Sequence, residues 1–162
     1  MGPSPDATMA MPEGAAERGH RERMGLLARS RADELAAAFA RAGIDRPFRW
    51  LRTPEVGLVM VRGRAGGSGA PFNLGEVTVT RCAVVLEDGA VGHGYVRGRA
   101  PEHARMAALV DAAAQVPSLA ERVEREIISP LAAAEMARRA ALAAETAATR
   151  VEFFTMERGD DP

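Results

Sequence analysis

A glycine-rich stretch in the middle of the chain has the residue types of an anion-binding loop. It runs from Val61 to Gly69 and places two arginines beside closely spaced glycines. Successive glycine N–H groups can point into one concavity and bind phosphate oxygens, and guanidinium groups can add paired hydrogen bonds. The candidate anion-binding residues are Arg62, Arg64, Gly66, Gly67, Ser68 and Gly69. Because a strand rather than a helix is predicted after the loop, a plain hairpin connection is the simpler alternative.

A second pair of arginines, Arg97 and Arg99, comes just before a predicted helix that begins at Pro101. The N-terminus of a helix attracts negative charge, so this pair could also bind a phosphate group. The simpler alternative is that both arginines are solvated at the end of a strand.

Other catalytic chemistry finds little support in the residue types. The sequence contains no lysine, which excludes a Schiff-base lysine and the lysine-dependent phosphate loop. His93 and His103 have no ligand partners at a suitable spacing and Cys82 is solitary, so we expect no metal site. His103 falls in the first turn of a helix, where a catalytic or capping role cannot be separated from plain exposure. No base marks Ser68 as a nucleophile, and we expect no catalytic residue in this chain.

The last residues form an unusual segment, in which two aromatic residues stand side by side near an acidic end. The candidate partner-interface residues in it are Val151, Phe153, Phe154, Met156 and Arg158. We expect either a final strand that closes the domain or a docking arm whose alternate side chains fill pockets on another subunit.

Composition and charge describe one domain of 162 residues with a net charge of −1. Aromatic residues are few, so we expect no nucleic acid partner, and no stretch approaches the ~18 consecutive apolar residues of a membrane span. A single cysteine fits a reducing compartment, so we expect a cytoplasmic location. Residues 46–105 carry nine arginines and five acids, whereas residues 106–162 carry six arginines and ten acids. The basic middle is therefore where we expect an anion or an acidic partner to bind.

The hydrophobic pattern predicts an α+β fold, with an antiparallel meander of four to five strands flanked by N-terminal and C-terminal helices. Residues 1–16 are expected to be a disordered leader. Residues 17–162 are expected to form a single domain, with residues 150–162 as its terminal strand or docking arm. A first helix is predicted from about Glu17 to Ala28, and Ser30 is expected to cap a second helix that ends at Gly43. The helical spacing of Leu35, Ala38, Phe39 and Ala42 predicts the buried stripe of the second helix.

The middle of the chain predicts the strands of the meander. Phe48–Thr53 is expected to be a strand, Pro54–Gly57 a turn, and Leu58–Val61 a central strand covered on both faces. A long strand follows from near Leu74. Its apolar alternation changes phase near Arg81, which indicates either a bulge or an arginine inside an apolar layer.

The C-terminal half begins with a hairpin and continues as helices. The pair Asp88-Gly89 predicts a tight turn into a strand over residues 91–97. Pro101 opens a helix whose buried stripe is predicted to be Met106, Leu109, Val110 and Ala113. Ser118 is expected to cap a second helix, and Ser129-Pro130 is expected to open a third that runs to about Thr149.

Several motifs between about Arg23 and Asp160 occur together in one known family. They are Glu55-x-Gly57-Leu58-Val59, Arg64-x-Gly66-Gly67-x-Gly69, Thr80-Arg81, Asp88-Gly89, Gly98-Arg99, His103-Ala104 and the ending Arg150-Val151-x-Phe153-Phe154-Thr155-Met156-x-Arg158-Gly159-Asp160. This pattern resembles PhnG, the G subunit of the bacterial carbon–phosphorus lyase system of phosphonate metabolism. The ending and the glycine-rich loop are the most specific parts of the resemblance.

The resemblance implies a function within a complex. It implies a cytoplasmic core complex with H, I and J subunits, which supports displacement of adenine from MgATP by an alkylphosphonate. The product would be a ribose 1-phosphonate 5-triphosphate, whose C–P bond a separate radical iron–sulfur subunit cleaves later. MgATP would be a substrate of the complex, and no cofactor is expected on this chain alone. The family's G subunit is not credited with catalytic residues, which implies an assembly or activating role.

Two alternatives to a purely assembling subunit stay open. In the first, the chain lends the four arginines Arg62, Arg64, Arg97 and Arg99 to the ATP or phosphonate site of the complex. In the second, it is a free-standing nucleotide-binding enzyme.

Overall fold

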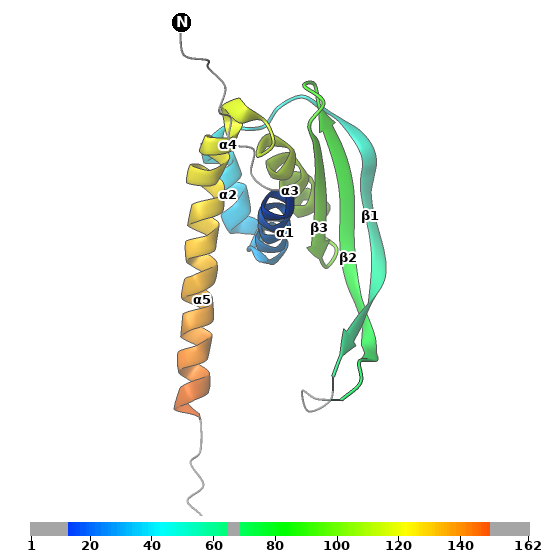
Figure 1. Ribbon diagram of the computed structural model, residues 1–162, viewed down its shortest axis with the longest axis vertical. Helices are drawn as coiled ribbons and strands as arrows, with labels where there is room; N and C mark the ends of the chain where they lie inside the picture. Colours follow the sequence, from blue (N-terminus) through cyan, green and yellow to red (C-terminus); the bar gives the residue numbers. More distant parts are fainter. Residues whose placement is uncertain (1–12, 65–68, 150–162) are drawn as a thin grey trace, which may run out of the picture.

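The computed structural model of the protein describes residues 13–64 and 69–149, which form helices packed beside an antiparallel sheet (Figure 1). The elements in chain order are α1 (Glu13–Arg29), α2 (Ala32–Ala42), β1 (Phe48–Gly63), β2 (Phe72–Leu86), β3 (Val91–Arg97), α3 (Pro101–Ala113), α4 (Pro117–Val123), a π-helical turn (Glu124–Ile128) and α5 (Ser129–Ala148). The predicted α+β class is confirmed. In the described part of the chain the sheet has three strands in the order β1-β2-β3, fewer than the four to five expected.

The lower strand count arises because β1 is one long strand. The turn expected at Pro54–Gly57 is wrong: β1 continues through it and absorbs the irregularity as shifts in its register with β2, between Trp50 and Arg52 and between Arg52 and Glu55. A proline lacks an N–H group and is tolerated at a sheet edge, and β1 is an edge strand. Leu58–Val61 is therefore not a central strand covered on both faces, since Leu58 is 62% exposed.

The hairpin between β2 and β3 was predicted correctly. Gly89 adopts a positive φ of 88°, and the Ala90 N–H donates to Oδ1 of Asp88 over 3.2 Å. The register of β2 with β3 is continuous past Arg81, so β2 itself does not bulge there. The side chain of Arg81 is exposed rather than buried in an apolar layer, and its Nε lies 3.5 Å from Oε2 of Glu55.

The change of phase in β2 reflects a change in which face of the strand is covered. In the upper half, Cys82, Val84 and Leu86 are buried in the main core on one face. In the lower half, Val77 and Val79 on the other face line a cleft beside the helices. The apolar residues of β2 therefore switch from one face of the strand to the other near Arg81, where the covered face changes.

Helix α3 lies over the sheet and supplies the largest share of the main core. Its residues Met106, Leu109, Val110 and Ala113 are buried as predicted. Helix α2 likewise buries its predicted stripe, which consists of Leu35, Ala38, Phe39 and Ala42. Gly43 ends α2 in the left-handed conformation, with φ 58° and ψ 37°, as expected for a C-terminal glycine.

The expected serine caps are wrong at all three sites. The N-cap of α2 is Arg31, that of α4 is Val116, and that of α5 is Ile128, and none makes a side-chain cap hydrogen bond. At the last site the chain runs on helically from α4 into α5. A π-helical turn there accommodates Pro130, which has no N–H to donate, so the predicted break does not occur.

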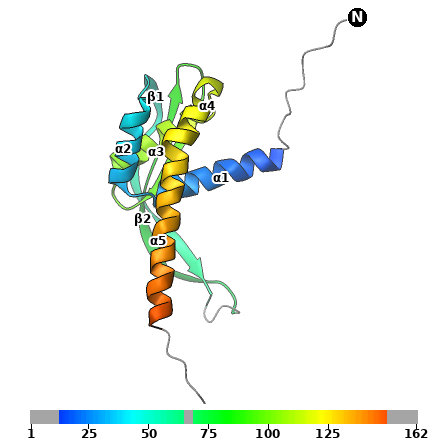
Figure 2. The same ribbon diagram turned by 90° about the vertical axis from the view of Figure 1, so that its left-hand side faces the viewer.

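The helix boundaries at the two ends differ slightly from expectation. α1 begins at Glu13, so the last four residues of the predicted leader belong to this helix, and residues 1–12 lie outside the described part. Figure 2 shows α1 running crosswise behind α5 and projecting beyond it. None of the described helices is long and apolar enough to cross a membrane.

Candidate functional site

The structure places the two groups of predicted anion-binding arginines far apart. Arg62 and Arg64 are exposed at the end of the β1–β2 hairpin, where Arg62 pairs with Asn73. Arg97 pairs with Val79, six residues further along β2, which corresponds to about 20 Å at ~3.3 Å per residue. The two groups therefore do not form one site. Gly69 is exposed at the edge of the loop, whereas Gly66, Gly67 and Ser68 lie outside the described residues.

Arg97 and Arg99 flank the sharp connection from β3 into α3. Gly98 between them adopts a positive φ of 87°, and Thr80 fixes the connection from β2. The Thr80 hydroxyl donates to the Gly98 carbonyl over 2.6 Å and accepts from the Ala100 N–H over 3.0 Å. Both arginines are exposed, as the simpler alternative supposed, but their surroundings differ, because Arg97 alone borders a cleft.

This cleft, which we call the ribbon cleft, has a volume of about 610 Å³ and lies between the sheet and the helices. On the sheet side it is lined by Val59, Val77, Val79, Tyr95 and Arg97. On the helix side it is lined mainly by Arg29, Ser30, His103 and Glu135. Three valines thus face a set of polar and charged groups, an arrangement suited to a ligand with an apolar part and an anionic part.

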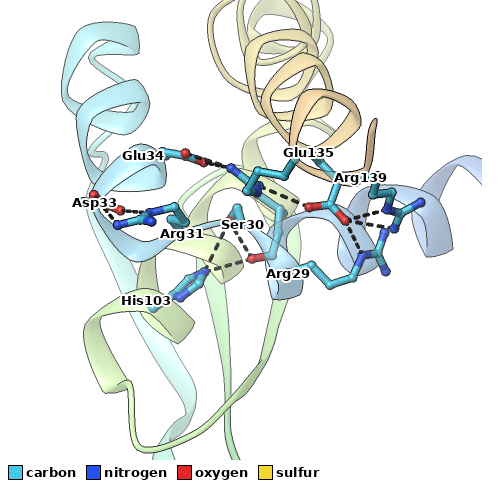
Figure 3. A network of polar contacts seen from close by, with 10 residues as sticks. Arg29, Ser30, Arg31, Asp33, Glu34, His103, Glu135 and Arg139 are labelled. Carbon is cyan, nitrogen blue, oxygen red and sulfur yellow. Dashed lines mark hydrogen bonds and ion pairs between the residues drawn. The ribbon is translucent and has the colours of Figure 1, made fainter. Parts of the chain in front are cut away.

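An ion-pair network borders the helix side of the cleft (Figure 3). Glu135 lies 3.5 Å from Nε of Arg29, 3.2 Å from Arg138 and 2.9 Å from Arg139. Burial opposes ionisation of Glu135, but hydrogen bonds and charge from Arg138 and Arg139 hold its pKa below the ordinary value. Arg138 also donates to Glu34 over 2.7 Å, which ties α5 to α2. Arg29 is thus partly neutralised, and it is a weaker candidate for anion binding than Arg97.

Ser30 and His103 meet at the base of the cleft, where the end of α1 touches the start of α3 (Figure 3). Both are buried, and the His103 Nε2–H donates to the Leu27 carbonyl over 2.8 Å. The Ser30 hydroxyl donates to the same carbonyl over 2.9 Å and lies 3.4 Å from Nε2. Because the hydroxyl proton is committed to a backbone carbonyl, this pair is not arranged as a nucleophile and its base. Its hydrogen bonds join α1 to α3, which answers the open question about His103 and explains why Ser30 does not cap α2.

A second buried polar cluster lies away from the cleft and was missed by the sequence analysis. Asp111 of α3 is fully buried and receives hydrogen bonds from Arg23 over 3.1 Å and from the His93 N–H over 3.0 Å. His20 of α1 also lies 3.1 Å from its carboxylate. The only local signal was an acidic residue within the apolar stripe of α3, and nothing in the sequence identified its partners.

The remaining predicted groups stay apart. Cys82 is buried, and burial raises the pKa of its thiol to about 11, so it is unreactive near neutral pH. His93 is an exposed residue of β3. Among the described residues, no three His, Cys, Asp or Glu side chains come together as metal ligands. The described part of the chain does not include the candidate partner-interface residues Val151, Phe153, Phe154, Met156 and Arg158.

Comparison with known proteins shows similarity over nearly the whole chain. The family model described as "Phosphonate metabolism protein PhnG" matches residues 18–159. A relative from Rhizobium meliloti (strain 1021), named alpha-D-ribose 1-methylphosphonate 5-triphosphate synthase subunit PhnG, is 48% identical over 149 residues. That alignment covers 91% of this chain and 93% of the relative.

Proposed function

The chain belongs to the PhnG family, and we propose from this premise that it is the corresponding subunit of a ribose 1-phosphonate 5-triphosphate synthase. The observation that carries the proposal is 48% identity over 91% of this chain and 93% of the relative. The described fold has no feature that requires another function.

In this proposal the complex is cytoplasmic, contains H, I and J subunits, and uses MgATP as a substrate. A phosphonate oxygen forms a bond to the ribose C1′, the bond from C1′ to adenine breaks, and adenine leaves with a proton. The chain holds no cofactor of its own and acts as an assembly or activating subunit. If the isolated chain turned over ATP and an alkylphosphonate at the rate of the whole complex, this role would be wrong.

The exposed end of the sheet supports an assembling role. Past the end of β3, β1 and β2 continue as a two-stranded ribbon, and two strands alone are marginally stable in water. Four large apolar side chains of this ribbon are 46–62% exposed, namely Leu58, Met60, Phe72 and Leu74. Such a cluster is typical of a surface that another protein covers.

We therefore expect Leu58→Glu combined with Met60→Glu to lower co-purification with the H, I and J subunits at least tenfold. Both side chains are about half exposed or more, so the free energy of unfolding of the isolated chain should change by no more than ~0.5 kcal/mol. Met136→Glu, on α5 and 65% exposed, is the matched control and should leave assembly intact. Normal recovery of the complex with the double variant would show that the ribbon is not the interface.

A second role is favoured by the position of Arg97. Among the described side chains no acid pairs with Arg97, and it borders the ribbon cleft beside three valines. We infer that Arg97 is the best placed of the four candidate arginines to lend an anion contact to the substrate site of the complex. Arg62 and Arg64 lie about 20 Å away along the ribbon at ~3.3 Å per residue, and Arg99 does not line the cleft.

Replacing Arg97 by alanine should raise the KM for ATP or for the alkylphosphonate roughly tenfold in the assembled complex, because a charged hydrogen bond contributes about 1.5–3 kcal/mol. Steady-state kinetics of the purified complex would measure this. Arg64→Ala is the matched control and should leave KM unchanged. Unaltered kinetics for Arg97→Ala in a fully assembled complex would exclude this second role.

A further inference from the structure

Among the described elements, α1 covers one face of α5 only over the first half of the helix. Glu135 and Arg139 of this face lie beside α1. The same face continues at helical spacing with Leu142, Ala143 and Thr146, which border an open apolar surface. Leu142 is 65% exposed. In Figure 1 both α5 and the ribbon extend well past the end of α1.

The ribbon presents a complementary apolar surface toward the same space. Val59 and Val77 line the ribbon cleft, which Glu135 of α5 borders from the other side. Val59 and Val77 pair with each other across the two strands, so both side chains lie on the same face of the ribbon. Leu58 lies on the opposite face and takes no part in the cleft. Within residues 13–64 and 69–149, no element packs against both the cleft side of the ribbon and the free face of α5.

We propose that residues Val151–Asp161 of the same chain turn back after α5 and lie along it in the ribbon cleft. This segment lies outside the described residues, and its composition fits such a place. Val151 and Phe153 fall on one side of an extended chain, and Phe154 and Met156 fall on the other. A strand that is apolar on both sides is suited to a position between α5 and the ribbon.

The length of the segment fits the distance that it must cover. From Glu135 to Ala148, α5 rises about 20 Å at ~1.5 Å per residue. An extended chain covers the same distance with about six residues at ~3.3 Å each. A segment that turns at Arg150 therefore returns to the level of Glu135 near Glu157, which places the acidic end of the chain beside the cleft.

Charge favours the same arrangement. Residues 150–161 contain four acids and two arginines, and three of the acids, Glu157, Asp160 and Asp161, follow the apolar part. At the level that they reach, Arg97 has no acidic partner among the described side chains. The acids would thus complete an ion pair for Arg97, and they would compete with any anionic ligand of the cleft. The proposal does not rest on the synthase function, because it concerns the isolated chain.

Cysteine cross-linking in the full-length chain tests this arrangement. Val59→Cys is combined with Phe154→Cys, and in parallel with Phe153→Cys because either side of the segment can face the ribbon. A short bis-maleimide should link at least one of these pairs within a single chain, as seen by mass spectrometry. Cys82 should not interfere, since burial raises the pKa of its thiol to about 11.

Leu58→Cys in place of Val59→Cys is the matched control, because Leu58 is adjacent in sequence and lies on the opposite face of the ribbon. We expect its link to either partner to form at least tenfold more slowly. Equal rates, or no link in any pair, would overturn the proposal. Links between two chains would also overturn it and would assign the cleft to the segment of a second copy. If Val59→Cys does not fold, Val77→Cys on the same face replaces it.

Discussion

Replacing Gly94 by alanine is expected to lower the free energy of unfolding by about 3 kcal/mol, at the upper end of the usual cost of overpacking a core. Gly94 lies in β3 directly beneath α3. A β-carbon there would overlap the backbone carbonyl of Ala104 and touch the sulfur of Cys82. Because the obstructing atoms belong mainly to the helix backbone, no side-chain rotation relieves the overlap, and α3 must move away from the sheet.

Gly92, two residues earlier, has the same relation to the next turn of α3. Its added β-carbon would meet the carbonyl of Ala108 and the backbone nitrogen of Ala112. The two glycines therefore set the distance between α3 and the sheet along two successive turns. Gly92→Ala should be as harmful as Gly94→Ala. The double variant should cost less than the sum of the two, because a helix already displaced by one substitution makes room for the other.

Gly57→Ala is the matched control for these variants. Gly57 also lies in a strand, but an added β-carbon there would meet no atom within 4 Å and its φ is not positive. We expect Gly57→Ala to change the free energy of unfolding by less than ~1 kcal/mol, because alanine restricts the unfolded chain and meets no obstacle in the folded one. Urea denaturation monitored by circular dichroism would measure the three single variants and the double variant. A loss for Gly94→Ala no larger than that for Gly57→Ala would contradict the close contact of α3 with the sheet.

Local patterns predicted the features of this fold that local chemistry determines. The Asp88-Gly89 turn, the buried stripe of α2 and its end at Gly43 follow from residues within a few positions of one another. The serine caps failed for a related reason, because a cap depends on where the helix starts and long-range contacts moved that start. Ser30 instead hydrogen-bonds at the contact between α1 and His103. At Ser129 the chain is already helical, because the π-helical turn continues directly into α5.

Features that depend on distant residues were not predictable from one sequence. Pro54 was expected to mark a turn, and only the position of β1 at the sheet edge makes it compatible with a continuous strand. The ribbon cleft combines residues from the sheet, α1, α3 and α5 that share no pattern in the sequence. Of the candidate arginines, the sequence could not distinguish Arg97, which borders this cleft, from Arg62 and Arg64, which do not.

Asp111→Ala is expected to be the most harmful change of a single charged residue, lowering the free energy of unfolding by about 3–5 kcal/mol, the usual cost of breaking a buried ion pair. The Asp111 side chain is fully buried, and that of its partner Arg23 is 20% exposed. The two residues are 88 positions apart in the sequence. Removing the carboxylate leaves the His93 N–H without its acceptor and leaves a largely buried guanidinium unpaired. Both groups would then be partly desolvated without compensation.

Asp111→Asn separates these two contributions. The amide oxygen can still accept the hydrogen bond from the His93 N–H, while the negative charge opposite Arg23 and His20 is lost. We expect a loss of roughly half that of Asp111→Ala, since one of the two partners stays satisfied. A double-mutant cycle of Asp111→Ala with Arg23→Ala should give a coupling of more than ~1 kcal/mol, as contacting residues do.

Glu102→Ala is the control on the same helix. Glu102 pairs with Arg105 over 2.9 Å, but its side chain is 76% exposed, and such a surface pair contributes no more than about 1 kcal/mol. If urea denaturation gave equal losses for Asp111→Ala and Glu102→Ala, the buried cluster would have no special role. The expected large difference would instead mean that Asp111 holds α1 against the free edge of β3. Arg29 and Ser30, at the end of α1, line the ribbon cleft. The Asp111 cluster would therefore also set the position of the helix side of that cleft.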